Sequence, residues 1–162
     1  MLSEKLEKAL NEQINAEFWS AYLYLSMSVH FESTGLTGFS AWFRGQFAEE
    51  QGHAAKIIQY IIARGGKVNL KSIDKVETSW KSPLSAFEDT LKHEKSVTKS
   101  IHNLVELARD EKDVATESFL KYFVDEQVEE EATATGIIDA LKFVDGDKIG
   151  IFMLNKELGA RK

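Results

Sequence analysis

The sequence predicts an all-α fold: a four-helix bundle made of two antiparallel hairpins joined by one long crossover, with a short fifth helix at the C-terminus. Three observations predict it. Apolar residues recur at spacings of three and four along four long segments, as the core of a bundle requires. The 162 residues include only 10 glycines and 1 proline, and long helices tolerate few of either. The links between the four segments are short, long and short in turn.

Local signals bound the first hairpin. A first helix is expected from its cap at Ser3 to about Glu32. A second helix is expected over residues 37–64, and it ends at Gly65-Gly66, a common signal for a helix C-terminus. The link at 33–36 is short, so it forces the two helices to run antiparallel to each other.

The second hairpin has equally clear boundaries. Ser82-Pro83 is typical of a cap followed by proline in the first turn, and it opens a third helix that extends to about Arg109. After the short link 110–113, a fourth helix continues to about Val144. The connection at 67–81 is long enough to extend over the full height of the bundle, which favours one crossover over a simple up-and-down arrangement.

A short amphipathic segment from Ile149 to Leu158 completes the expected helices.

The composition excludes several classes of protein. The absence of cysteine excludes disulfides, zinc fingers and iron–sulfur clusters. A net charge of −6 disfavours nucleic acids as partners and favours cations. No apolar run is long enough to span a membrane, and the charged N-terminus does not resemble a signal peptide. We therefore expect a cytoplasmic protein.

The four apolar stripes are each interrupted by polar side chains near the middle of the helix. Helices of similar length, packed side by side, bring these groups to one level of the core. Ionised carboxylates cannot be buried there unless they are paired, protonated or bound to a metal. No lysine or arginine lies on the stripes at this level, so the cation must come from outside. The interrupting residues are Glu17, Glu50, His53, Glu94, Gln127 and Glu130.

The types of ligand indicate which metal the group binds. Carboxylates with one imidazole suit iron or manganese, and the absence of thiolates disfavours softer metals. The spacing Glu50-x-x-His53 places both side chains on one face of a helix, as in the di-iron carboxylate bundles. The other histidines, His30, His93 and His102, have no such partner in the pattern. We expect them to play no part in metal binding.

These residues occur in stretches that are similar to a known family. Over essentially its whole length the chain resembles the bacterial and archaeal non-haem ferritins, which implies a single ferritin-like di-iron domain over residues 1–162. The resemblance lies in Asn11-Glu12-Gln13-Ile14-Asn15-Ala16-Glu17, Glu49-Glu50-Gln51-Gly52-His53, Lys92-His93-Glu94 and Glu126-Gln127-Val128-Glu129-Glu130-Glu131. Such a set, spread over four helices in the family's order, is far more specific than one Glu-x-x-His motif.

The resemblance implies a role for each candidate residue. Glu17 and His53 would bind one iron, Glu50 would bridge, and Glu94 would bind the second iron. Gln127 would lie beside the site, and the carboxylate of Glu130 would contact its metals. Tyr24 corresponds to the family's tyrosine near the centre and would supply an electron during the reduction of O₂; packing in the core is the alternative for this residue.

The resemblance also implies a third iron position, with Glu49, Glu126, Glu129 and Glu130 as its ligands. The cofactor is then non-haem iron, two or three ions per subunit. Haem is not expected, because bacterioferritins carry a methionine just after the bridging glutamate and this chain has Gln51 there.

The implied function is that of an iron-storage ferroxidase. Such a subunit oxidises Fe(II) with O₂ or H₂O₂ and deposits ferric mineral inside a cage of twenty-four subunits. Two alternatives remain open at this point. One is a di-iron oxidase or peroxidase that does not store iron; the other is a metal-free interaction bundle, which would leave the carboxylates in the middle of the core unexplained.

Overall fold

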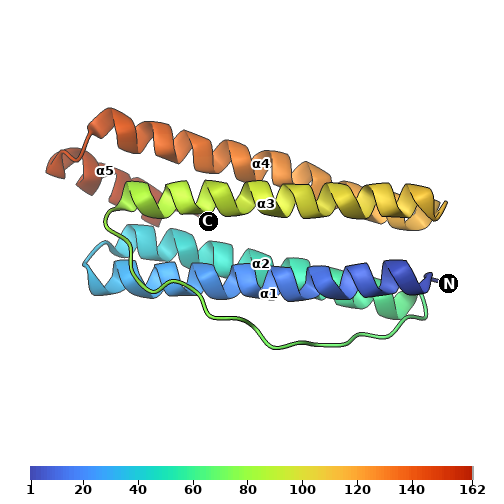
Figure 1. Ribbon diagram of the computed structural model, residues 1–162. Helices are drawn as coiled ribbons and strands as arrows, with labels where there is room; N and C mark the ends of the chain where they lie inside the picture. The colour runs from blue at the N-terminus through green and yellow to red at the C-terminus, as the bar shows by residue number, and fades with distance from the viewer. Residues whose placement is uncertain (162) are drawn as a thin grey trace.

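The computed structural model describes residues 1–161, and the ordered elements in this range are five α-helices (Figure 1). The helices are α1 (Glu4–Ser33), α2 (Thr37–Ala63), α3 (Pro83–Asp110), α4 (Val114–Val144) and α5 (Lys148–Gly159). No helix in this range has the length and the apolar character that are needed to cross a membrane. The predicted all-α fold is confirmed, and the helix boundaries agree with the predicted ones to within one or two residues.

Capping residues at the ends of the helices explain this agreement. The Ser3 hydroxyl accepts a hydrogen bond from the Leu6 amide, 3.2 Å away, at the start of α1. Ser82 and Ser85 form a reciprocal capping box at the start of α3. Gly65 follows α2 with φ of +74°, a backbone conformation that side chains with a Cβ rarely adopt. Because each signal acts within a few residues, it can be recognised in the sequence alone.

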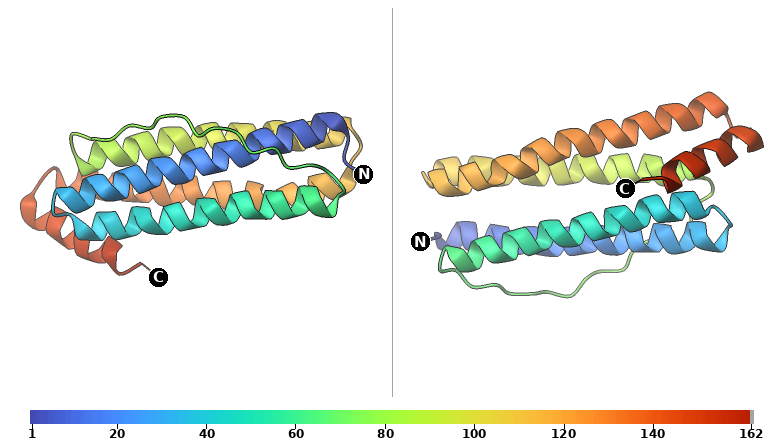
Figure 2. Two further views of the ribbon diagram at one scale, coloured as in Figure 1. Left: turned by 90° about the horizontal axis from the view of Figure 1, so that it is seen from below. Right: turned by 180° about the vertical axis from the view of Figure 1, so that it is seen from behind.

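The crossover between α2 and α3 runs along the outside of the bundle from one end to the other (Figures 1 and 2). The crossover therefore makes α2 and α3 run parallel, whereas the short links make α1 and α2 one antiparallel pair and α3 and α4 the other. At the end of α2, Arg64 and Asp113 form an ion pair of 2.9 Å. Asp113 also caps α4 by accepting a hydrogen bond from the Thr116 amide. This ion pair therefore connects the two hairpins at one end of the bundle.

The apolar core is divided into two clusters along the bundle. One contains aromatic side chains such as Phe31, Phe43 and Phe87, and the other is mostly aliphatic, with Leu10 and Ile57 among its members. Buried polar and charged side chains lie between the two clusters in the sequence of every helix of the bundle. The stripes predicted from the sequence therefore have apolar ends and a polar middle.

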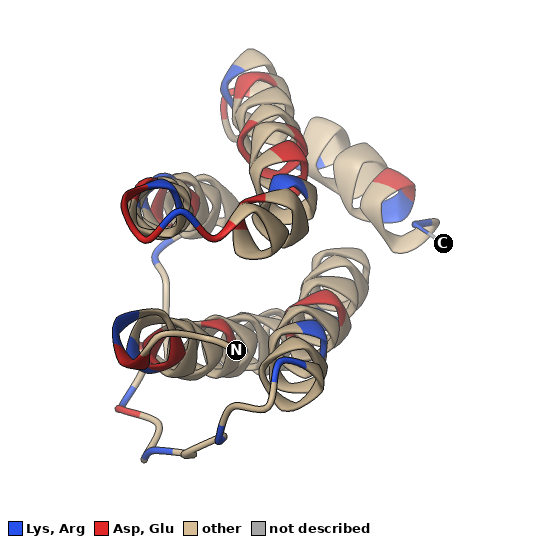
Figure 3. Cartoon of the chain, turned by 90° about the vertical axis from the view of Figure 1, so that its right-hand side faces the viewer, with Lys and Arg blue, Asp and Glu red and all other residues tan. Residues whose placement is uncertain are grey.

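The fifth helix packs on the outside of the bundle against α2 and α4 (Figure 3). Helix α2 has no cap from a neighbouring side chain at its N-terminus. Instead, Asn155 of α5 supplies it: the Asn155 Oδ1 atom accepts hydrogen bonds from the amides of Gly38 at 2.8 Å and Phe39 at 3.1 Å. This contact satisfies two backbone donors that a helix start leaves without partners.

Gly38 is required for this contact, and replacing it provides a test of how α5 is held. A Cβ atom built at Gly38 would lie 1.6 Å from the Asn155 carbonyl oxygen. Gly38→Ala is therefore expected to displace α5 while the other four helices remain folded. Hydrogen exchange should show faster exchange confined to α5 and the first turn of α2. Gly52→Ala is the matched control, because a Cβ atom there meets nothing within 4 Å; unchanged exchange in α5 of Gly38→Ala would contradict this account.

Candidate metal centre

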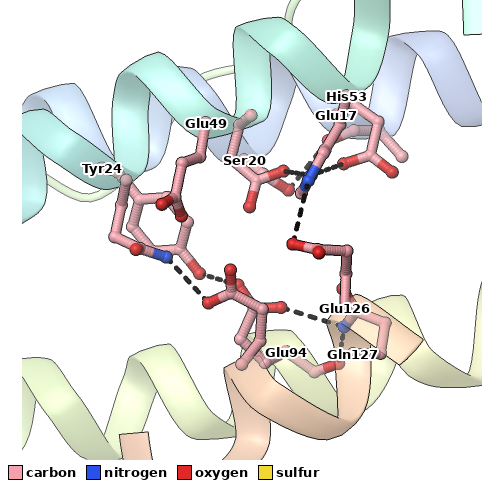
Figure 4. Close-up of polar contacts among 12 residues, drawn as sticks. Glu17, Ser20, Tyr24, Glu49, His53, Glu94, Glu126 and Gln127 are labelled. Carbon is pink, nitrogen blue, oxygen red and sulfur yellow. Dashed lines mark hydrogen bonds and ion pairs between the residues drawn. The ribbon is translucent and has the colours of Figure 1, made fainter. Parts of the chain in front are cut away.

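All six residues that interrupt the apolar stripes are buried in the folded chain. Helix α1 supplies Glu17, α2 supplies Glu50 and His53, α3 supplies Glu94, and α4 supplies Gln127 and Glu130. The exposed fraction of each is 9% or less, and that of Glu17 and Glu94 is 1%. Figure 4 shows that the side chains of Glu17, His53 and Glu94 point into the space between the two hairpins. The structure therefore places all six at one level of the core.

Three of these residues form a tight group. Ligand atoms of Glu17, Glu50 and His53 all lie within 4.8 Å of one another. His53 Nδ1 is 3.2 Å from Glu50 Oε2 and 4.0 Å from Glu17 Oε2. Among residues 1–161 this is the only group of three or more His, Cys, Asp or Glu side chains that meets this distance. Two carboxylates and one imidazole are a suitable donor set for a first-row transition metal.

Glu94 lies on the opposite hairpin and is held by two partners. The Tyr24 hydroxyl donates a hydrogen bond to Glu94 Oε1. The Gln127 amide donates to Glu94 Oε2 at 3.0 Å and also to the Thr98 hydroxyl at 3.2 Å. Tyr24 is fully buried. Tyr24 lies in the apolar core and also contacts a candidate ligand, so its role as an electron donor stays a prediction.

Glu130 extends from α4 toward α2. The Gln46 amide donates a hydrogen bond to Glu130 Oε2 at 2.9 Å. This contact orients the carboxylate in the same way as Gln127 orients Glu94. Gln46 thus donates to Glu130, and Gln127 donates to Glu94. Both donors are neutral amides, so they do not offset the negative charge of an ionised carboxylate.

The pKa values of the carboxylates reflect this lack of compensation. Burial, followed by the charges of Glu94 and Glu130, raises the pKa of Glu50 from 4.5 to about 8. Burial, together with the charge of Glu94, raises the pKa of Glu130 to about 7. The pKa values of Glu17 and Glu94 are also raised, in both cases chiefly by burial. Without a cation, several of these groups hold a proton at neutral pH.

One oxygen of the group accepts no hydrogen bond from the protein while Glu17 and Glu50 are both ionised, although a proton on Glu17 could be shared with Glu50. Glu17 Oε2 is the only buried side-chain oxygen or nitrogen among the described residues that lacks a hydrogen bond. The other oxygen, Oε1, accepts a hydrogen bond of 2.8 Å from Gln13. Gln13 is itself fixed by the Ser100 hydroxyl on α3. A buried oxygen without a partner is costly, and a metal ion bound next to His53 and Glu50 would remove this cost.

The residues of the expected third iron position are not gathered in the same way. Glu49 and Glu129 are exposed and Glu126 is half-buried. Glu126 Oε2 is 3.8 Å from His53 Nε2, so it lies next to the buried group. Glu49 instead forms an ion pair with Arg161, with 2.7 Å between Oε1 and Nη2. The third position therefore remains a prediction.

One neighbour of the site did not emerge from the sequence. His93 lies 2.6 Å from the Ser20 hydroxyl, between Nε2 and Oγ, and its ring packs against Trp19 and Tyr24. Burial lowers the pKa of His93 to about 4, so its ring is neutral. Ser20 is 73 residues away in the sequence, and no local spacing links the two. The position of His93 one residue before Glu94 gave no indication of this contact.

Comparisons with known proteins identify relatives of this chain. A family model described as a ferritin-like domain matches residues 7–144. The bacterial non-heme ferritin of Bacteroides fragilis strain 638R is 52% identical over 161 residues, which cover 99% of this chain and 100% of the relative. The bacterial non-heme ferritin of Staphylococcus haemolyticus is 42% identical, with 99% and 97% covered.

The fold also matches solved structures. A crystal structure of an open pore ferritin from the hyperthermophilic archaeon Archaeoglobus fulgidus superposes with a TM-score of 0.99 at 51% identity, and all of both chains is covered. A closed form of the same ferritin, engineered by site-directed mutagenesis, superposes with a TM-score of 0.98 at 50% identity, covering 100% of this chain and 99% of the other.

Proposed function

Because the chain belongs to the ferritin family, we propose that it is an iron-storage subunit whose buried carboxylates bind pairs of Fe(II) ions and promote their oxidation. In this proposal Glu17 and His53 bind one ion, Glu94 binds the other, and Glu50 lies between them. Glu130 contributes from α4, Gln127 positions Glu94, and Tyr24 is a candidate electron donor. Iron is a substrate that passes through this site on its way to storage.

The observation that supports this proposal best is the Glu17 oxygen without a hydrogen bond, in a cluster of buried carboxyls whose pKa values are raised. Glu17 Oε2, Glu50 Oε2 and His53 Nδ1 lie close together, and no lysine or arginine side chain forms an ion pair with Glu17, Glu50, Glu94 or Glu130 among residues 1–161. A structural role alone would favour apolar side chains here, since replacing buried charges by apolar groups is often neutral or stabilising.

The two halves of the site explain why Fe(II) would react in pairs. Each Fe(II) loses one electron, and two ions supply the two electrons that reduce O₂ to H₂O₂ or H₂O₂ to water. His53 and Glu50 are on one hairpin and Glu94 on the other, so a pair of ions would lie between the hairpins. The two apolar clusters lie on either side of the site along the bundle.

Storage requires assembly, and we include it in the proposal. Solved ferritin structures match this chain over its full length, which supports assembly into a cage, with twenty-four subunits as the expected number. The exposed apolar residues of α5, Ile149, Phe152 and Met153, are available for contacts between subunits. A cytoplasmic location is part of the same proposal.

The test is an anaerobic titration of the iron-free protein with Fe(II), followed by admission of oxygen while absorbance is recorded. We expect saturation at two or three ions per chain and rapid oxidation. The same sample is then sized by light scattering, and a large hollow assembly is expected. Binding of one ion or none, with oxidation no faster than in buffer, would refute the proposal. A monomer or dimer that oxidises iron rapidly would refute only the storage role.

A further inference from the structure

The end of α5 brings a positive charge to the acidic surface beside the buried group. Arg161 follows the helix, and its guanidinium Nη2 atom lies 2.7 Å from Glu49 Oε1. Its Nη1 atom donates a hydrogen bond of 3.1 Å to the Trp42 carbonyl oxygen. The guanidinium also lies over the Trp42 ring, 4.8 Å from the ring centre. Three separate contacts thus fix one side chain, a geometry in which arginine is favoured over lysine.

The backbone near this contact is shaped to admit the arginine. A Cβ atom at Gly45 would lie 3.3 Å from Arg161 Nη1, so the absence of a side chain at this position leaves room for the guanidinium. The cap that Asn155 provides at the start of α2 holds the helix that precedes Arg161. The position of the guanidinium is therefore determined by the packing of α5 as a whole.

Glu49 belongs to the same electrostatic environment as the buried carboxylates. It directly precedes Glu50 in α2, and its charge contributes to the raised pKa values of Glu50 and Glu130. The pKa of Tyr122 is raised by burial and then by the charges of Glu126, Glu49 and Glu129. Figure 4 shows Glu49 and Glu126 on opposite sides of the space between α2 and α4. Of these surface carboxylates, Glu49 alone has an arginine partner among the described residues.

We propose that Arg161 is a built-in competitor for cations at Glu49, so that a metal ion binds beside the buried group only when the guanidinium is displaced. This inference rests on the proposed function, because it concerns the outermost cation position of the same site. Arg161 is a positioning residue: it acts through Glu49 and contacts no residue of the buried group. Displacement is feasible because the side chains of Arg161 and Glu49 are 26% and 46% exposed, and exposed ion pairs are weak and screened by salt.

The inference is tested with Zn²⁺, which does not change oxidation state, by calorimetric titration of the iron-free assembled protein. Arg161→Gln removes the positive charge and keeps a polar side chain at this position. We expect the weakest Zn²⁺ site of each chain to bind about 3- to 10-fold more tightly, roughly the change that a surface ion pair of about 1 kcal/mol would produce. The tighter sites should not change.

Matched variants separate this effect from others. Lys156→Gln removes an exposed positive charge from α5, the helix that precedes Arg161. This variant should leave the affinity of every Zn²⁺ site unchanged. In Glu49→Gln, adding Arg161→Gln should have no further effect, because the competed carboxylate is gone. Equal tightening in Arg161→Gln and Lys156→Gln, or an effect of Arg161→Gln that persists without Glu49, would overturn the inference.

Hydrogen exchange of α5 in Arg161→Gln shows whether the helix still packs against the bundle. If α5 exchanges faster, Arg161→Lys is compared instead, since it keeps the charge without the planar contacts; wild-type affinity in that variant supports competition by charge. If the wild-type protein has no tight Zn²⁺ site, the proposed function is refuted instead. The two failures are therefore distinguishable in one data set.

Discussion

Replacing Glu50 with alanine is expected to reduce Fe(II) oxidation to the rate in buffer. Among residues 1–161, Glu50 is the one carboxylate that lies next to His53 and Glu17 and whose pKa is also raised by the charges of Glu94 and Glu130. Its loss would separate the two halves of the site. A pair of Fe(II) ions could then no longer be held together for a two-electron reaction.

The fold of this variant is expected to survive. Because burial penalises its ionised form, a carboxylate with a pKa of about 8 destabilises the iron-free protein progressively between about pH 4.5 and pH 8. Glu50→Gln, which keeps the volume, should therefore have a melting temperature at pH 8 equal to or above that of the wild type. The control is Glu88→Ala, an exposed glutamate of α3, which should leave the oxidation rate unchanged. Rapid oxidation in Glu50→Ala would place the reaction elsewhere in the chain.

Much of this architecture could be predicted because its determinants are local. The caps at Ser3 and Ser82 and the glycine at Gly65 act within one turn of their helices. The polar interruptions of the apolar stripes are similarly visible at spacings of three and four. Since the helices have similar lengths and run antiparallel, a residue in the middle of one faces the middle of another. The burial of Glu17 and Glu94 follows from this alone.

The remaining features depend on contacts between residues that are distant in the sequence. Asn155 caps α2 from 116 or more residues away, and Arg161 contacts Glu49 across 112 residues. Both contacts depend on the angle at which α5 packs against the bundle, and no periodicity in the sequence specifies that angle. His93 illustrates the same limit: its side chain contacts Ser20 only because α1 and α3 are neighbours at this height.

The affinity of the site for a divalent metal is expected to rise steeply with pH between about pH 6 and pH 8. At pH 6 Glu50, with a pKa of about 8, and Glu130, with a pKa of about 7, both hold a proton. A metal ion must displace these protons before the carboxylates can bind it. Each proton released changes the affinity about tenfold per pH unit, so two released protons correspond to about a hundredfold.

Stability should change in the opposite sense. The folded-state pKa of Glu50 is raised from 4.5 to about 8, so the unfolded chain loses this proton at lower pH than the folded chain does. As far as this group is concerned, the iron-free protein is therefore most stable below about pH 4.5, loses stability progressively as pH rises from about 4.5 to about 8, and loses no more above that pH. A bound metal ion removes the penalty, so the stabilisation by Zn²⁺ should be largest at the upper end of this range.

Both effects can be measured in one series of calorimetric titrations with Zn²⁺ at pH 6, 7 and 8. Each pH is run in two buffers with different heats of ionisation, and the difference between the buffers gives the number of protons released. We expect this number to fall as pH rises, and to be smaller at pH 6 in Glu130→Gln than in the wild type, because the variant has one proton fewer to lose. Release that does not vary with pH would mean that the buried carboxylates are already ionised. They would then have to be stabilised by a cation or by donors other than Gln13, Gln46 and Gln127, and the partnerless oxygen of Glu17 would no longer indicate a site that awaits a metal ion.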